Sequence, residues 1–234
     1  MKPIISIIIP VLNEQAQINT TLSALFRLKG AETTEIIVVD GDTRGNTVSV
    51  IEYHHVVKIL SPKGRSMQMN EGARSANGDM LLFLHADTRL PWTAFCDITC
   101  ILGEKDIAGG AFDLKIDGKG PGYRIIEKAA SLRSRLTRLP YGDQAIFVKK
   151  TWFIKTGGFL SVPLMEDINF MQRLNMAGAN IKILPNPVLT SARRWKKEGL
   201  ILCTLRNWLI LVLYLTGVSP ERLTHLYPEN HNHI

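Results

Sequence analysis

The feature that most constrains the fold of this chain is a series of short apolar runs that alternate with stretches of helical periodicity. The first run, residues 4–9, is continuous and rich in isoleucine, which is typical of a strand covered on both faces. The first half is predicted to continue with a helix at 14–28, strands at 35–39 and 56–60, a helix at 66–76 and a strand at 80–84. Because strands and helices alternate at this spacing, the sequence predicts parallel βαβ units and an α/β fold.

Polar residues follow these predicted strands at their carboxyl ends. Asp40-Gly41-Asp42-Thr43 comes after the second strand, and His85-Ala86-Asp87 comes after the fourth. In open α/β sheets, ligands bind outside the carboxyl ends of the strands. The sequence therefore predicts a binding crevice where these segments meet.

The second half is less regular. It is expected to contain a strand at 107–116, a helix at 123–136 and a short strand at 145–148. Gly109 and Gly110 within the long strand indicate a bulge or a close backbone approach. Asp167 stands at the N-cap position of a further predicted helix. No segment rich in Pro, Gly or Ser separates the halves, so we expect one domain.

Composition and charge narrow the classes of function. With 45% apolar and 21% charged residues, the 234-residue chain has globular composition. Three cysteines, an odd and sparse set, argue against a disulfide framework and favour a reducing, cytoplasmic compartment. The net charge of +7 indicates an anionic partner, but the basic residues are scattered, so nucleic acid is not expected. Polar residues from Pro10 onward interrupt the apolar N-terminus, which favours a buried strand over a signal peptide.

The segment 199–218 is apolar but contains Arg206 and Asn207. Its uninterrupted part, residues 208–218, is shorter than the roughly 20 residues that cross a bilayer. Two interpretations stay open. The segment packs against the rest of the chain or a second subunit, or it lies in an anionic membrane interface beside the basic residues at 193–197.

Four motifs in order resemble those of family 2 glycosyltransferases of the GT-A fold. They are Pro10-Val11-Leu12-Asn13-Glu14, Asp40-Gly41-Asp42-Thr43, His85-Ala86-Asp87 and Glu166-Asp167. The resemblance implies a Rossmann-like, mostly parallel sheet flanked by helices, with a C-terminal helical extension. It divides the chain into a GT-A domain at 1–198, with a nucleotide-binding half at 1–105 and an acceptor half at 106–198, and an apolar helix and tail at 199–234.

A narrower resemblance rests on four segments. Residues 64–70, 84–88, 141–144 (Tyr141-Gly142-Asp143-Gln144) and 191–195 are similar to a small bacterial subgroup associated with radical-SAM proteins or arsenosugar biosynthesis. This resemblance does not identify an acceptor.

The family resemblance implies metal-dependent transfer, with inversion, of a sugar from a nucleoside-diphosphate sugar to a hydroxyl acceptor; a UDP-sugar is favoured. A cation held by Asp87 would neutralise the leaving diphosphate. The family usually has Asp at both ends of the 85–87 triplet, whereas this chain has His85, which is either a second ligand or a packed residue. Mg²⁺ or Mn²⁺ is the expected ion. The alternative is that Asp87 caps a helix beginning near Pro91.

For the donor, the resemblance implies contacts from the backbone of Pro10 and Val11 and from the side chain of Asp40. Arg65 is expected to bind the diphosphate or base, unless it is a solvated surface residue. The remaining expected substrate-binding residues are Asn13, Glu14, Asp42, Ala86, Asp143, Gln144, Arg194 and Trp195. Asn13 and Glu14 are alternatively loop-locking residues, and Asp143 and Gln144 belong alternatively to a structural turn.

The expected catalytic residues are Asp167 and Glu166. Asp167 is favoured as the general base that takes the acceptor proton, with Glu166 contacting the acceptor or supporting the loop. Adjacent carboxylates raise each other's pKa, which suits a base. Acidic residues are also common at helix starts. The competing class is a non-catalytic sugar-nucleotide-binding or membrane-associated scaffold, which would tolerate the loss of Asp87 and Asp167.

Overall fold

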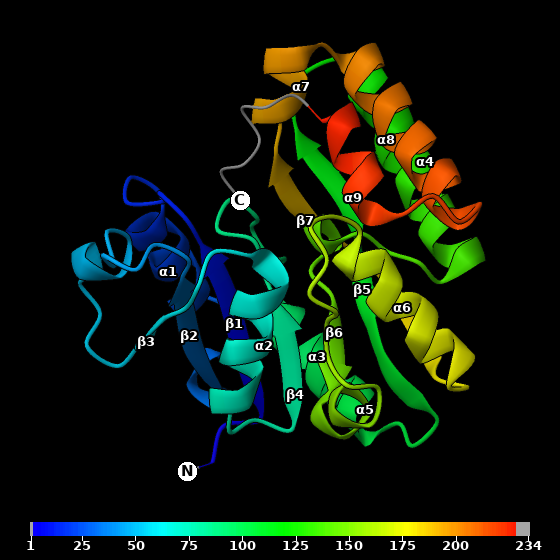
Figure 1. Cartoon of the computed structure of the whole chain (residues 1–234). Coiled ribbons are helices and arrows are strands. Elements are labelled where there is room, and N and C mark those ends of the chain that lie inside the picture. The colour runs from blue at the N-terminus through cyan, green and yellow to red at the C-terminus, as the bar shows by residue number, and fades with distance from the viewer. Residues whose placement is uncertain (1, 228–234) are drawn as a thin grey trace.

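A computed structural model describes residues 2–227 and contains one seven-stranded sheet, with the order β3-β2-β1-β4-β6-β5-β7 (Figure 1). The strands are β1 Ile5–Val11, β2 Thr34–Asp40, β3 Val57–Leu60, β4 Met80–Phe83, β5 Ile107–Asp117, β6 Phe147–Lys149 and β7 Asn180–Ser191. Neighbouring strands are parallel except that β6 runs antiparallel to both β4 and β5. The predicted mostly parallel α/β sheet is confirmed.

Helices cover both faces of this sheet. They are α1 Ile18–Phe26, α2 Arg65–Ser75, α3 Ala94–Gly103, α4 Pro121–Thr137, α5 Lys150–Lys155, α6 Glu166–Met176, α7 Arg193–Glu198, α8 Leu200–Leu215 and α9 Pro220–Leu223. Leu22 of α1 and Phe95 of α3 pack in one apolar cluster, while Met69 of α2 and Phe170 of α6 pack in the other. Every residue of β1 is buried, as its unbroken apolar run predicts.

The double glycine in β5 marks a close backbone approach. A Cβ atom on Gly109 would lie 2.3 Å from the carbonyl oxygen of Phe147, and one on Gly110 would lie 1.9 Å from that of Lys182. The register between β5 and β7 also shifts between Ile107 and Gly109. The sequence offered a bulge or a close backbone approach as alternatives at this position, and the structure has both.

Several elements were not expected. The edge strand β7 contains Pro185 and Pro187, which argue against a strand but are tolerated at a sheet edge. The proposed N-cap at Asp167 is wrong, because α6 begins at Glu166 after Met165, whose φ is 64°. The alternative that Asp87 caps a helix is also wrong, because Thr93 precedes α3 as its N-cap.

All three cysteines are free, as expected. Within residues 2–227, no helix is both long enough and apolar enough to cross a membrane. Residues 228–234 of the predicted C-terminal tail lie outside the described residues.

Candidate active site

A cavity of about 560 Å³ lies where the carboxyl ends of β1 and β4 meet the second half of the chain. Ten of the residues expected from the sequence line it: Asn13, Glu14, Arg65, His85, Asp87, Asp143, Glu166, Asp167, Arg194 and Trp195. A small adjoining hollow of about 40 Å³ is lined by Pro10, Val11 and Ala86 and shares Arg65, His85 and Asp87 with the cavity. The fold thus gathers residues that are far apart in the sequence into one crevice.

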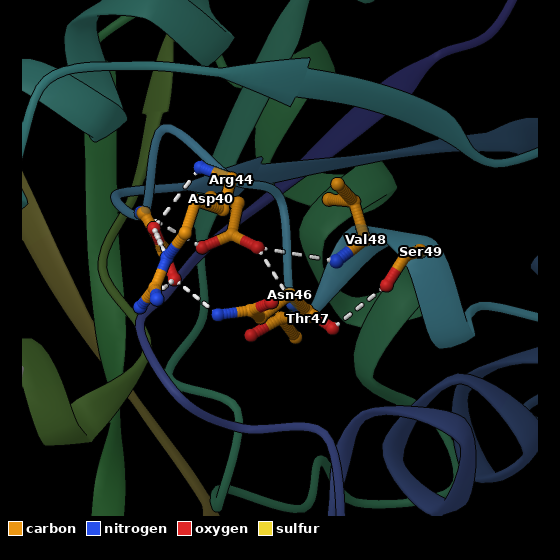
Figure 2. A network of polar contacts seen from close by, with 7 residues as sticks. Asp40, Arg44, Asn46, Thr47, Val48 and Ser49 are labelled. Atoms are coloured by element: carbon orange, nitrogen blue, oxygen red, sulfur yellow. Dashed lines mark hydrogen bonds and ion pairs between the residues drawn. The ribbon is translucent and has the colours of Figure 1, made fainter.

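Asp40 and Asp42 do not line these hollows. Figure 2 shows that the buried Asp40 carboxylate instead closes the loop after β2, since it accepts hydrogen bonds from the N–H groups of Thr47 at 2.8 Å and Val48 at 3.2 Å. Its other oxygen accepts the N–H of Asp42 at 3.0 Å. Asp42 in turn accepts bonds from Arg44 and Asn46. Both carboxylates stabilise the loop in this structure.

Gln144 is also outside the cavity. Its buried side-chain oxygen accepts the Ser134 hydroxyl at 2.6 Å, and its amide nitrogen donates to the carbonyl of Phe112 at 2.9 Å. Gln144 therefore fixes the turn of residues 141–144 against α4 and β5.

Glu166 is buried and pairs with Arg65 from the other half of the chain, at 3.2 Å between Nη1 and Oε1. Burial raises the pKa of Glu166, the charge of Arg65 opposes that rise, and the neighbouring Asp167 adds to it. The expected repulsion within the acidic pair is present, but burial is the larger cause.

Asp167 has a different environment. Its Oδ2 accepts the N–H of Gly142 at 2.7 Å, and its Oδ1 accepts the N–H of Ile168 at 2.7 Å. A Cβ on Gly142 would lie 3.0 Å from Nε2 of His85 and 3.5 Å from Oδ2 of Asp167. The distance to His85 is tight, whereas the distance to Asp167 is an ordinary contact, so the absence of a side chain at Gly142 makes room for His85.

Left-handed backbone occurs in and beside the cavity. Non-glycine residues with left-handed φ include Asn13 at 58° and Met165 at 64°, which line the cavity, and Ala145 at 50°, which ends the turn at 142–144. Such conformations cost on the order of 1–3 kcal/mol each and concentrate at functional sites.

Three cavity side chains carry buried polar atoms that have no hydrogen-bond partner within the described residues. These atoms are Nε of Arg65, Oδ1 of Asp143 and Nε1 of Trp195. Burial also raises the pKa of Asp143, although the charges of Arg194 and Arg133 counteract it. Because buried polar groups normally have partners, these atoms fit a site that receives a polar ligand.

A guanidinium lies beside the expected metal ligand. Nη2 of Arg193 is 3.1 Å from Oδ2 of Asp87 and 3.5 Å from Oε1 of Glu14. Burial and the charges of Arg65 and Arg194 hold the pKa of His85 well below its usual value, so the imidazole is neutral near pH 7. Among residues 2–227, no group of three or more His, Cys, Asp or Glu side chains could hold a metal. Asp87 would therefore need ligands from a substrate or water.

The sequence interpretation missed other lining residues. They include Tyr141, Thr190, Ser191, Arg193, Asn207 and Tyr227. Tyr141, Ser191 and Arg193 lie within the segments 141–144 and 191–195, which were singled out in the sequence without a role for these three residues. Asn207 and Tyr227 come from the C-terminal segment, and no local pattern indicates that they reach the cavity.

The mostly parallel sheet flanked by helices is the fold of GT-A glycosyltransferases. The model of the family described as glycosyl transferase family 2 matches residues 6–160, more than half of the chain. The chain belongs to this family and is a glycosyltransferase.

Two curated relatives agree. An uncharacterized glycosyltransferase of Haemophilus influenzae is 27% identical over 215 residues, which cover 87% of this chain and 69% of that protein. The probable glycosyltransferase YdaM of Bacillus subtilis is 24% identical over 229 residues. This match covers 84% of the chain but only 51% of YdaM.

Solved structures share the fold at low identity. The mannosyltransferase PcManGT of Pyrobaculum calidifontis, in complex with GDP-Man and Mn²⁺, has a TM-score of 0.69 and 16% identity over 97% of this chain and 69% of that one. TarS 1-349 of S. aureus, in complex with UDP-GlcNAc, has a TM-score of 0.64 and 18% identity. That match covers 80% of this chain and 58% of the TarS chain.

The Arg65–Glu166 pair yields a stability prediction. Arg65→Leu leaves a buried carboxylate without its cation, so it should lower the free energy of unfolding by about 2–3 kcal/mol at neutral pH. The folded-state pKa of Glu166 lies above the ordinary value. Protonation of Glu166 therefore favours the folded state. The stability that Arg65→Leu loses should become smaller as pH falls, because a neutral Glu166 no longer needs a cation. Urea unfolding at about pH 8 and about pH 5 checks this. The double variant Arg65→Leu/Glu166→Leu should recover most of the stability; an equal loss at both pH values would contradict the account.

Proposed function

We propose that the chain is a metal-dependent, inverting glycosyltransferase that moves a sugar from a nucleoside-diphosphate sugar, with a UDP-sugar favoured, to a hydroxyl acceptor. One observation carries the assignment of the base. Of the five carboxylates that line the cavity, Glu14, Asp87 and Glu166 are ion-paired, while Asp143 and Asp167 have no ion pair within the described residues. Asp167 is partly exposed to the cavity and is held by N–H groups, so it is oriented without being neutralised by a cation.

The residues around Asp87 fit a divalent cation in part. Asp87 and Glu14 already converge on one positive group, the Arg193 guanidinium, so the position suits a cation. We propose that Asp87 holds Mn²⁺ or Mg²⁺, with His85 as a second ligand and with diphosphate oxygens and water completing the shell. When bound, such an ion neutralises charge on the leaving diphosphate.

Other residues of the cavity bind the donor and take the acceptor proton in this proposal. Arg65 and Arg194, both in the cavity, supply fixed positive charge for the diphosphate. Asp167 accepts the proton of the acceptor hydroxyl while that oxygen attacks the anomeric carbon from the face opposite the diphosphate. The bond between the anomeric carbon and the diphosphate oxygen breaks, and the electron pair leaves with the diphosphate. Asp143, with its unpartnered oxygen, would accept a hydrogen bond from a sugar hydroxyl.

The narrower resemblance, to the small bacterial subgroup, is consistent with this proposal. The residues shared with the subgroup associated with radical-SAM proteins or arsenosugar biosynthesis include Tyr141-Gly142-Asp143-Gln144, which forms one wall of the cavity or supports it. Membership of that subgroup remains a proposal and assigns no acceptor.

The base assignment is tested by comparing Asp167→Asn with Asp143→Asn. An amide cannot take the proton, so Asp167→Asn should lower kcat by about 100-fold or more while UDP affinity is unchanged. Asp143→Asn should leave kcat nearly unchanged, because Asp143 takes no proton in this mechanism and the amide retains an oxygen that accepts a hydrogen bond. Steady-state kinetics with the donor that the enzyme turns over, together with UDP titration, make the measurement. A large kcat loss in Asp143→Asn alone would make Asp143 the base.

We also propose that α8 contacts an anionic membrane interface. One face of α8 packs inward through Cys203, Ile210 and Leu211, and Ile210 reaches the cavity. The opposite face is exposed and contains no charged residue. This exposed stripe consists of Ile201, Leu202, Leu205, Trp208, Leu209, Val212 and Leu215.

Charge supports a bilayer over a second copy of the chain as the partner. Lys196 and Lys197 are exposed just before α8, and the net charge of +7 disfavours self-association while favouring an anionic surface. An apolar stripe flanked by lysines is the pattern of helices that lie in a membrane interface.

The double variant Leu205→Glu/Leu209→Glu should reduce binding to vesicles of phosphatidylcholine and phosphatidylserine by at least about tenfold. Met176→Glu, on an exposed apolar residue of α6, is the matched control and should bind normally. Co-sedimentation measures the binding, and light scattering gives the oligomeric state. A dimer that the double variant dissociates, without vesicle binding, would assign the stripe to a second copy instead.

A further inference from the structure

We infer that Arg193 is a built-in counter-cation for Asp87 and Glu14 that competes with the divalent metal and so couples metal binding to donor binding. This inference rests on the proposed function, because it concerns the same metal and diphosphate. It assigns a role to Arg193, which lies outside the motifs at 10–14, 40–43 and 85–87 and outside the pair Glu166-Asp167.

The geometry places one guanidinium nitrogen between two carboxylates from separate strand ends. Nη2 of Arg193 lies 3.1 Å from Asp87, which follows β4, and 3.5 Å from Glu14, which follows β1. Burial raises the pKa of Glu14 and Asp87 adds to that rise, while Arg193 counteracts both. The two carboxylates therefore repel each other, and Arg193 is the group that offsets this repulsion.

Arg193 is also free to leave. Its side chain is 65% exposed, whereas those of Asp87 and Glu14 are 26% and 19% exposed. The backbone of Arg193 is held in place, because its N–H donates to the Ser191 hydroxyl at 3.2 Å. Trp195, two residues further along α7, is buried. The guanidinium can thus turn away while the start of α7 stays in place.

A metal ion alone meets an unfavourable exchange at this position. It must displace Arg193 from Asp87, which leaves the guanidinium with the longer contact to Glu14. Three further basic residues, Arg65, Arg194 and Lys197, line the same cavity, so the displaced cation remains in a positively charged environment. A diphosphate changes this balance because it offers Arg193 a bidentate anionic partner and offers the metal additional oxygen ligands. Metal and nucleotide should therefore bind with positive coupling, and Arg193 should account for part of it.

The test measures Mn²⁺ binding to the full chain by electron paramagnetic resonance, first with Mn²⁺ alone and then with UDP or GDP present. Arg193→Gln is compared with Arg74→Gln, which removes the same charge from an exposed arginine that pairs with Glu71 outside the cavity. Arg193→Gln should raise the affinity for Mn²⁺ alone about three- to tenfold, the effect of removing one or two partly exposed ion pairs. The factor by which the nucleotide strengthens Mn²⁺ binding should fall by the same amount. Arg74→Gln should match the wild type, and circular dichroism confirms that both variants are folded.

Equal or weaker Mn²⁺ affinity in Arg193→Gln would overturn the inference. The inference would also be overturned if the nucleotide increased Mn²⁺ affinity by the same factor in Arg193→Gln as in the wild type. If the proposed function is wrong, neither UDP nor GDP will bind the wild type or the variants. The titration with Mn²⁺ alone involves no nucleotide, so it still reports on the competition between Mn²⁺ and Arg193 at Asp87.

Discussion

The site depends on the buried ion pair between Arg65 and Glu166. It joins the first turn of α2, in the first half of the chain, to the first turn of α6, in the second, across 101 positions of sequence. A buried carboxylate is tolerated only when a cation or several donors compensate it, so the pair fixes how closely these two helices approach. Asp167 is the next residue after Glu166, and its position in the cavity therefore follows from the same contact.

Charge pairing then separates the roles of the cavity carboxylates. Arg65 compensates Glu166, and Arg193 compensates Asp87 and Glu14. Arg194 lies near enough to Asp143 to oppose the rise in its pKa. Asp167 differs because its partners are the N–H groups of Gly142 and Ile168. These donors orient the carboxylate without an ion pair to it, which suits the proton transfer that we propose for Asp167.

The sequence predicted the positions of the cavity residues best where they follow from the geometry of a parallel sheet. Residues 10–14 and 85–87 meet because the carboxyl ends of adjacent parallel strands lie at one edge of a sheet, so the order of apolar runs was enough to place them. Asp40 and Gln144 were expected at the substrate because of their motifs, yet their partners are loop N–H groups and a serine on α4, which depend on exact backbone conformation. Pro185 and Pro187 concealed β7, because a proline is compatible with a strand only at an edge, and edge positions are set by the whole sheet. Tyr227 reaches the cavity through the docking of the C-terminal helices, a long-range packing event without a local pattern.

We propose above all that the crevice between β1, β4 and α6 binds a nucleoside diphosphate. Calorimetric titration of the chain with UDP and GDP, each with and without Mn²⁺, measures this binding. We expect saturable binding of one nucleotide in the micromolar range, strengthened by Mn²⁺. If the folded protein bound neither nucleotide under either condition, the proposed function would be wrong.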